Sequence, residues 1–145
     1  MKILVCTDGS EQSQKALEKA ALIAGGCNVN DVAIIHVNEE DLPYMEAYSR
    51  NVIERYMQIK EENKKEIERI LKEALKFFEE KGIKARTIFK EGHPAETIVE
   101  VGCGENFDFI VIGSRGLGGL KKALLGSVSN AVVQQAEKCS VIVVR

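Results

Sequence analysis

Five short runs of apolar, mostly β-branched residues recur along the 145-residue chain, and segments with helical spacing of apolar residues separate them. These runs predict strands at residues 2–6, 31–37, 83–92, 107–114 and 140–145. Strands that alternate with helices form a parallel sheet with helices on both faces. The sequence therefore predicts an α/β fold, a single open, doubly wound sheet, in one domain that spans residues 1–145.

The expected helices cover residues 10–26, a long charged segment that ends near 81, residues 93–106 and about 127–138. Ser10 or Asp8 is placed to cap the first of them. The long helix has one apolar stripe near its end, formed by Ile67, Ile70, Leu71, Ala74, Leu75 and Phe78. Its earlier part, KEENKKE, lacks apolar residues and is expected to project from the body. The sequence does not fix the conformation between Asn38 and Lys60, where Pro43 favours a loop or short helical insert.

Charge and hydropathy exclude several classes of protein. Twenty basic and 22 acidic residues give a net charge of −2, and the two signs are mixed along the chain, so no basic footprint for nucleic acid is present. No apolar run is long enough to span a bilayer. The first residues lack the pattern of a signal peptide, so we expect a cytoplasmic protein.

The four cysteines are Cys6, Cys27, Cys103 and Cys139. None of them forms a CxxC pair, and both histidines stand far from them in the sequence, so a zinc site is not predicted. Scattered buried or half-buried thiols in a reducing compartment are the simplest interpretation.

The glycine-rich stretch GSRGLGGLKKALLGSVS directly follows the fourth expected strand. Ligands of open α/β sheets bind at the carboxyl ends of the strands, and the first strand ends in CTDGS, so Asp8 would face this loop if the two strands are neighbours. Gly113 and Gly116 would allow a tight turn and a close approach to a ligand. Gly126 precedes a helix whose free N–H groups favour an anion. A flexible connector is the alternative interpretation.

The loop matches neither of two common nucleotide motifs. A Walker A loop needs GxxxxGK[ST], which the chain lacks. A GxGxxG fingerprint fails because Lys121 occupies the third glycine position, and it would belong after the first strand.

The spacing Gly113-x2-Gly116-x9-Gly126-Ser127 resembles the G-x2-G-x9-G-[ST] motif of the nucleotide-binding members of the universal stress protein (UspA-like) family. The segments TDGSE, IIHV, GHPAETIVE and VIVVR extend the resemblance over essentially the whole chain. Two departures are Cys6, where the family often has proline or a small residue, and Ser140, where it usually has proline.

The resemblance implies the strand order 3-2-1-4-5 and ATP as the ligand, with Mg or Mn held through the phosphates and Asp8 reaching the metal through water. Cys6, Thr7 and Asp8 would border the adenosine, and Val37 the adenine. The ribose and phosphates would lie on the remaining site residues, which are Ile112, Gly113, Arg115, Gly116, Gly126, Ser127, Val128 and Ser129.

Structural roles compete with several of these assignments. Asp8, Ser127 and Ser129 are also suited to cap helices. Arg115, Lys121 and Lys122 would either screen phosphate charge or form a solvated loop face. His93 fits a turn, and His36 fits the core of a strand better than a site.

The sequence predicts no catalytic residue, because no lysine is fixed on the phosphates and no base for a water is evident. We therefore expect a regulatory switch, in which the nucleotide orders the glycine loop and residues 44–56 toward an unknown protein partner. A weak ATPase or phosphotransferase, a sensor of AMP or a cyclic nucleotide, and a member that acts through protein contacts alone stay open. The resemblance also implies a homodimer through the last strand, which begins at Ser140 and ends at Arg145.

Overall fold

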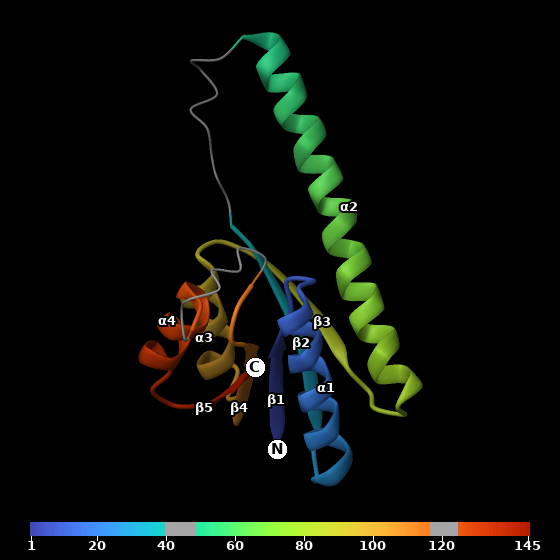
Figure 1. Ribbon diagram of the computed structural model, residues 1–145, viewed down its shortest axis with the longest axis vertical. Coiled ribbons are helices and arrows are strands. Elements are labelled where there is room, and N and C mark those ends of the chain that lie inside the picture. The colour runs from blue at the N-terminus through green and yellow to red at the C-terminus, as the bar shows by residue number, and fades with distance from the viewer. Residues whose placement is uncertain (40–48, 117–124) are drawn as a thin grey trace.

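The computed structural model describes residues 1–39, 49–116 and 125–145 (Figure 1). The expectations for Lys121 and Lys122, and for most of the segment before the long helix, lie outside these residues. The elements in chain order are β1 (Lys2–Cys6), α1 (Glu11–Gly26), β2 (Asp31–Asn38), α2 (Arg50–Glu80), β3 (Arg86–Glu91), α3 (Pro94–Gly104), β4 (Phe109–Gly113), α4 (Ser127–Gln135) and β5 (Ser140–Val144).

All five strands form one parallel sheet in the order β3-β2-β1-β4-β5. This confirms the predicted fold class and strand order. In the centre of the sheet, Val5 of β1 pairs with Ile34 of β2 on one side and with Val111 of β4 on the other. Chain order reverses between β1 and β4, so their carboxyl ends border the switch point where open α/β sheets bind ligands.

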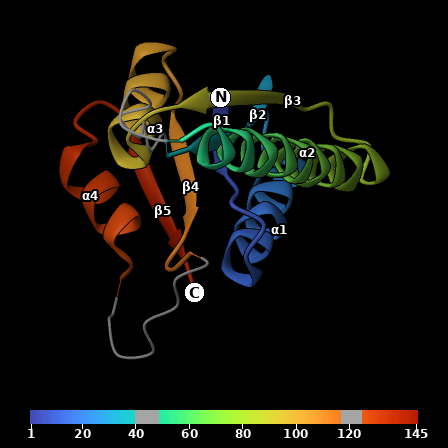
Figure 2. The same cartoon turned by 90° about the horizontal axis from the view of Figure 1, so that it is seen from above.

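Side chains alternate between two cores, one on each face of the sheet. Ile3 and Val5 of β1 pack into the core under α1 and α2, whereas Leu4 and Cys6 pack into the core under α3 and α4. Seen from above, α3 and α4 lie together on one side and α1 and α2 on the other (Figure 2).

Helix α2 is packed against the sheet only through its second half. Its apolar stripe is confirmed: Ile67, Leu71, Ala74 and Phe78 are buried. The first half extends beyond the body (Figure 1), as the apolar-free segment KEENKKE predicted for the earlier part of this helix. Apolar side chains on that half are exposed, namely Val52, Met57 and Ile59. In the ranges that the structure describes, no helix combines the length and apolar character needed to cross a membrane.

Several element boundaries differ from the sequence-based expectation, and three of the larger differences have a local explanation. Strand β3 begins at Arg86 rather than at residue 83, because the N–H of Ile83 donates to Phe78 O and closes the end of α2. Strand β4 begins at Phe109, because the N–H of Phe107 donates to Gly102 O at the end of α3. Helix α4 ends at Gln135 because Ala136 is already extended, with ψ of 97°.

Candidate functional site

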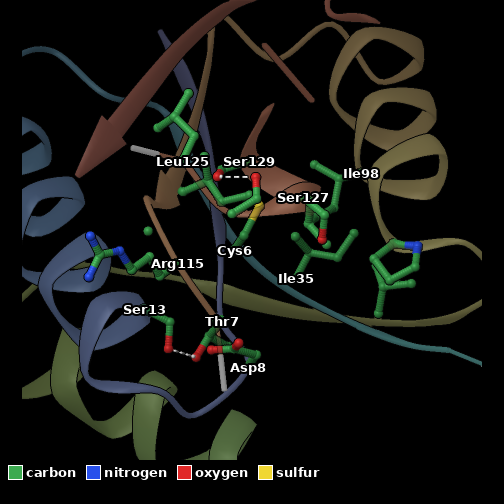
Figure 3. Close-up of a pocket in the computed structure, with 17 residues that line it drawn as sticks. Cys6, Thr7, Asp8, Ser13, Ile35, Ile98, Arg115, Leu125, Ser127 and Ser129 are labelled. Atoms are coloured by element: carbon green, nitrogen blue, oxygen red, sulfur yellow. Dashed lines mark hydrogen bonds between the residues drawn. The ribbon is translucent and has the colours of Figure 1, made fainter. Parts of the chain in front are cut away.

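A cavity of about 460 Å³ lies at the carboxyl ends of β1, β2 and β4 (Figure 3). Its volume is within the usual range for small-molecule sites. All twelve residues predicted for the site line it. Five further described residues line it, and none of them was predicted: Ser13, Ile35, Pro94, Ile98 and Leu125.

The end of β1 is fixed by a polar turn that leads into α1. Ser10 is the N-cap of α1, since its Oγ accepts from the N–H of Ser13 at 3.2 Å. Asp8 is not the cap; its Oδ1 accepts from the N–H of Ser10 at 3.0 Å. The buried Thr7 hydroxyl lies 3.3 Å from Ser13 Oγ, and these two groups face each other in Figure 3. The carboxylate of Asp8 is therefore held at the rim of the cavity.

His36 supports the same turn from β2, a contact that sequence analysis missed. Its Nδ1 lies 2.9 Å from Thr7 O. Because a carbonyl oxygen only accepts, Nδ1 carries the proton in this arrangement. The imidazole is buried, as predicted, and burial lowers its pKa below the ordinary value. A neutral His36 thus fixes the backbone of a residue that lines the cavity.

Two glycines of the motif allow close contacts within the protein. Neither Gly113 nor Gly116 has a positive φ, so neither is required by a left-handed turn. A Cβ on Gly113 would lie 2.8 Å from the backbone C and O atoms of Gln12, so this glycine allows β4 to pack against α1. A Cβ on Gly116 would lie 2.6 Å from Asp8 Oδ2. Gly116 therefore permits the close approach of the loop to the end of β1.

The amino end of α4 is held against the end of β4. The N–H of Gly126 donates to Ser114 O at 2.7 Å, and the buried Ser129 hydroxyl lies 3.1 Å from the same oxygen. The Ser129 hydroxyl thus anchors the helix, and it is not an N-cap. Gly126 occupies the N-cap position without a side-chain cap from any described residue. Ser127, Val128 and Ser129 follow it on the cavity wall.

This helix end is suited to an anion. The first N–H groups of a helix have no intrahelical partner, and the helix dipole adds about 0.3–1 kcal/mol for a negative charge. Each hydrogen bond to a charged group contributes roughly 1.5–3 kcal/mol. Since the described residues supply no other cap, the amides of Ser127, Val128 and Ser129 are available to a ligand in the cavity.

Part of the cavity wall is apolar. It consists of Ile35 and Val37 from β2, Ile98 from α3 and Ile112 from β4. Cys6 lies beneath them, and burial raises the pKa of its thiol far above the ordinary value, so it stays neutral. The cavity therefore combines an apolar slot, formed by these isoleucine and valine side chains, with an anion-binding helix end.

The described residues contain no cluster of three or more His, Cys, Asp or Glu side chains that could hold a metal ion. Among the described residues that line the cavity, Asp8 is the acidic one. The donor set therefore fits a Mg²⁺ or Mn²⁺ ion that arrives with a phosphate ligand and keeps several waters. It does not fit a metal bound by the protein alone.

The topology and the position of the cavity define a doubly wound α/β domain with a ligand cavity at the switch point of its sheet. The chain belongs to the universal stress protein family, whose family model matches residues 1–145.

Individual relatives of the chain are also universal stress proteins. The universal stress protein YxiE of Bacillus subtilis is 38% identical over 147 residues, which cover 99% of this chain and 98% of the relative. The universal stress protein MJ0577 of Methanocaldococcus jannaschii is 32% identical over 158 residues; its solved structure aligns with a TM-score of 0.80 over 99% of this chain and 94% of that chain. A universal stress protein solved in complex with cAMP is 26% identical and has a TM-score of 0.73 over 100% of this chain and 97% of that chain.

Proposed function

We propose that this protein binds ATP, accompanied by Mg²⁺ or Mn²⁺, and acts as a nucleotide-dependent regulatory switch. One observation carries the proposal: a helix end without a side-chain cap among the described residues and an apolar slot line one cavity at the switch point. An adenine nucleotide has the matching chemistry, because it joins a flat apolar base to an anionic tail. The adenine would lie against Ile35, Val37 and Ile98, and the phosphates against the amides at the start of α4.

The relative solved with cAMP supports an adenine nucleotide as the ligand class. It also supports a second candidate function, a sensor of AMP or a cyclic nucleotide, because the amides at the helix end can bind one phosphate group as well as a chain of three. The two candidates differ in one respect: a triphosphate brings a divalent cation, and Asp8 is placed at the rim where such a cation and its waters would lie. Binding that strengthens with each phosphate and with Mg²⁺ supports the ATP switch.

We propose that the bound nucleotide is a signal rather than a substrate. Phosphoryl transfer depends on charged groups that clamp the phosphates and orient the nucleophile. Among the described residues that line the cavity, the charged side chains are Asp8 and Arg115, and none is a lysine. ADP production at saturating ATP measures turnover directly. A steady rate that disappears in Asp8→Asn would instead support the weak ATPase.

The first experiment identifies the ligand. The protein is purified under gentle conditions, the bound small molecule is released, and its identity is determined by chromatography and mass spectrometry. Calorimetric titrations with ATP, AMP and cAMP, with and without Mg²⁺, then rank the nucleotides. The expected result is an adenine nucleotide in the native protein and measurable binding of MgATP.

A matched pair of variants assigns the site. Ser127 is exposed in the first turn of α4, where an acidic residue favours the helix. Ser127→Asp should therefore fold normally and repel phosphate, whereas the neutral Ser127→Asn of similar shape should bind. An empty native protein with no calorimetric signal up to about 1 mM ATP, a limit near −4 kcal/mol, would overturn the proposal.

A further inference from the structure

A pair of cysteine thiols lies at the opposite end of the sheet from the candidate site. Cys103 in the last turn of α3 and Cys139 just before β5 are 36 residues apart in the sequence, yet their sulfur atoms are 2.7 Å apart. The sequence predicted four scattered thiols. Cys6 and Cys27 are indeed distant single thiols, although Cys27 is exposed rather than buried. Cys103 and Cys139 are half-buried and in direct contact.

A small reagent has access to this pair. Both thiols line a cavity of about 580 Å³ at the amino ends of β4 and β5, together with Asn106, Asp108, Glu137 and Lys138. The backbone around them is fixed, since the N–H of Ser140 donates to Asp108 O at 3.0 Å. The 2.7 Å separation is close to the covalent sulfur–sulfur distance of about 2.05 Å. Closing the bond therefore requires only a small movement.

We propose that Cys103 and Cys139 form a reversible redox pair, which a low-molecular-weight disulfide oxidises to an intramolecular disulfide. The Cys103 thiolate attacks one sulfur of the small disulfide and releases one thiolate, which leaves a mixed disulfide on Cys103. Cys139 then loses its proton and attacks Cys103 Sγ, which releases the second small thiol. Two protein thiols are oxidised and one small disulfide is reduced to two thiols.

The environment favours this order of attack. Burial, together with the neighbouring Cys103, raises the pKa of Cys139 to about 12. Cys139 thus keeps its proton, and Cys103, whose sulfur lies within hydrogen-bond distance of the Cys139 thiol, acts as the first nucleophile. Once Cys103 is in the mixed disulfide, its charge no longer opposes ionisation of Cys139, which becomes the resolving thiol.

The position of the pair gives the bond a structural effect. Residues 103–139 include β4, Gly116 and the whole of α4, so the bond would join the two ends of the segment that carries the anion-binding part of the candidate site. A cross-link restrains the unfolded chain more than the folded one. Oxidation should therefore stabilise this segment against local unfolding. This effect does not depend on the proposed nucleotide.

The test uses the full chain carrying Cys27→Ser, which removes the exposed thiol. The protein is incubated with oxidised glutathione, free thiols are alkylated, and peptides are analysed by mass spectrometry. The expected product is a monomer lighter by two hydrogen atoms, with the Cys103 and Cys139 peptides linked. Its melting temperature should rise by roughly 5 °C or more and return after reduction with dithiothreitol.

A second variant tests the order of attack. In Cys139→Ser the resolving thiol is absent, so glutathione should accumulate as a stable adduct on Cys103. A wild-type pair that stays fully alkylatable in excess oxidised glutathione would overturn the proposal. Links between two chains in place of the internal bond would overturn it as well.

Discussion

A Cβ placed on Gly116 would lie 2.6 Å from Oδ2 of Asp8, so the loop after β4 and the turn after β1 are in direct contact. The two residues are 108 positions apart and meet because β1 and β4 are neighbours in the sheet. A side chain at residue 116 would displace the carboxylate from the rim of the candidate site. The glycine is therefore required by the position of an acidic group and not by its own backbone angles.

The contact predicts a binding defect in Gly116→Ala with little loss of stability. The methyl group displaces the end of a flexible carboxylate, so the free energy of unfolding should change by less than about 1 kcal/mol. Binding of MgATP should weaken by ~1–2 kcal/mol in calorimetry. In an Asp8→Ala background the same substitution should cost much less. Gly25→Ala is the matched control, since a Cβ there meets no atom within 4 Å. If Gly116→Ala weakens MgATP binding equally in the wild type and in Asp8→Ala, the contact between residues 116 and 8 does not cause the defect.

The packing of Gly102 on α3 predicts a loss of stability on substitution, in contrast to the binding defect expected for Gly116→Ala. Its Cβ would lie 2.6 Å from Ile110 Cδ1 inside the core between α3 and the sheet. Gly102→Ala should lower the free energy of unfolding by ~1–3 kcal/mol, as overpacking does. Urea denaturation measures this, and Ile110→Val, which removes Cδ1, should restore part of the loss. Gly104→Ala in the same helix meets nothing within 4 Å and serves as the control. An unchanged midpoint for Gly102→Ala would refute the packing described for this face.

Burial of His36 predicts a loss of stability at acid pH. Because the pKa of His36 is lowered in the folded protein, the unfolded chain takes up a proton first as the pH falls. The contribution of neutral His36 to the free energy of unfolding is fully present above the unfolded pKa of about 6.5. It is lost as the pH falls toward the lower pKa of His36 in the folded protein. His36→Asn keeps a donor near Nδ1 but cannot titrate, so the free energy of unfolding should depend less on pH between about 5 and 7. His93→Asn removes the exposed imidazole for comparison. Identical profiles for wild type and His36→Asn would contradict the prediction.

The position of β5 at the edge of the sheet predicts how two copies of the chain would associate. It is the last strand of the sheet and pairs with β4 along one edge, so its other edge is available for pairing. We propose a homodimer through this edge. Val143→Lys should give monomers in size-exclusion chromatography, because a two-fold axis would bring two lysines together. A melting curve confirms that the variant is folded. A dimer that persists in the folded variant would argue against this interface.

The parallel α/β sheet could be predicted from the alternation of strands and helices, which leaves few topologies, and the strand order 3-2-1-4-5 was supplied by the family resemblance. Some of the twelve proposed site residues, such as Asp8 and Gly126, stand at a strand end or a helix start that local patterns mark, whereas others, such as Val37 and Val128, were assigned through the family resemblance. All twelve line one cavity. Their binding of a nucleotide stays a prediction.

The remaining lining residues could not be predicted because they reach the cavity through packing. Pro94 and Ile98 belong to α3, and only its placement over the sheet brings them to the apolar slot. The contact of His36 with Thr7 O depends on the register of β2 against β1. The segment GHPAETIVE was part of the family resemblance, and it was the one available signal that α3 contributes to the site. The Cys103–Cys139 contact had no signal in the spacing, since α3 and the start of β5 meet only in the folded protein.

The most direct test of the account is a calorimetric titration of MgATP into Ser127→Pro and Ser127→Ala. Both variants lack the hydroxyl, but only proline lacks the backbone N–H, and proline is well tolerated at the first position of a helix. Gly126 already has φ of −69° and ψ of 162°, which suits a residue before proline. If the helix end binds the phosphates, Ser127→Pro should bind ~10–150-fold more weakly than Ser127→Ala. Equal affinities would place the phosphates elsewhere and contradict the central claim.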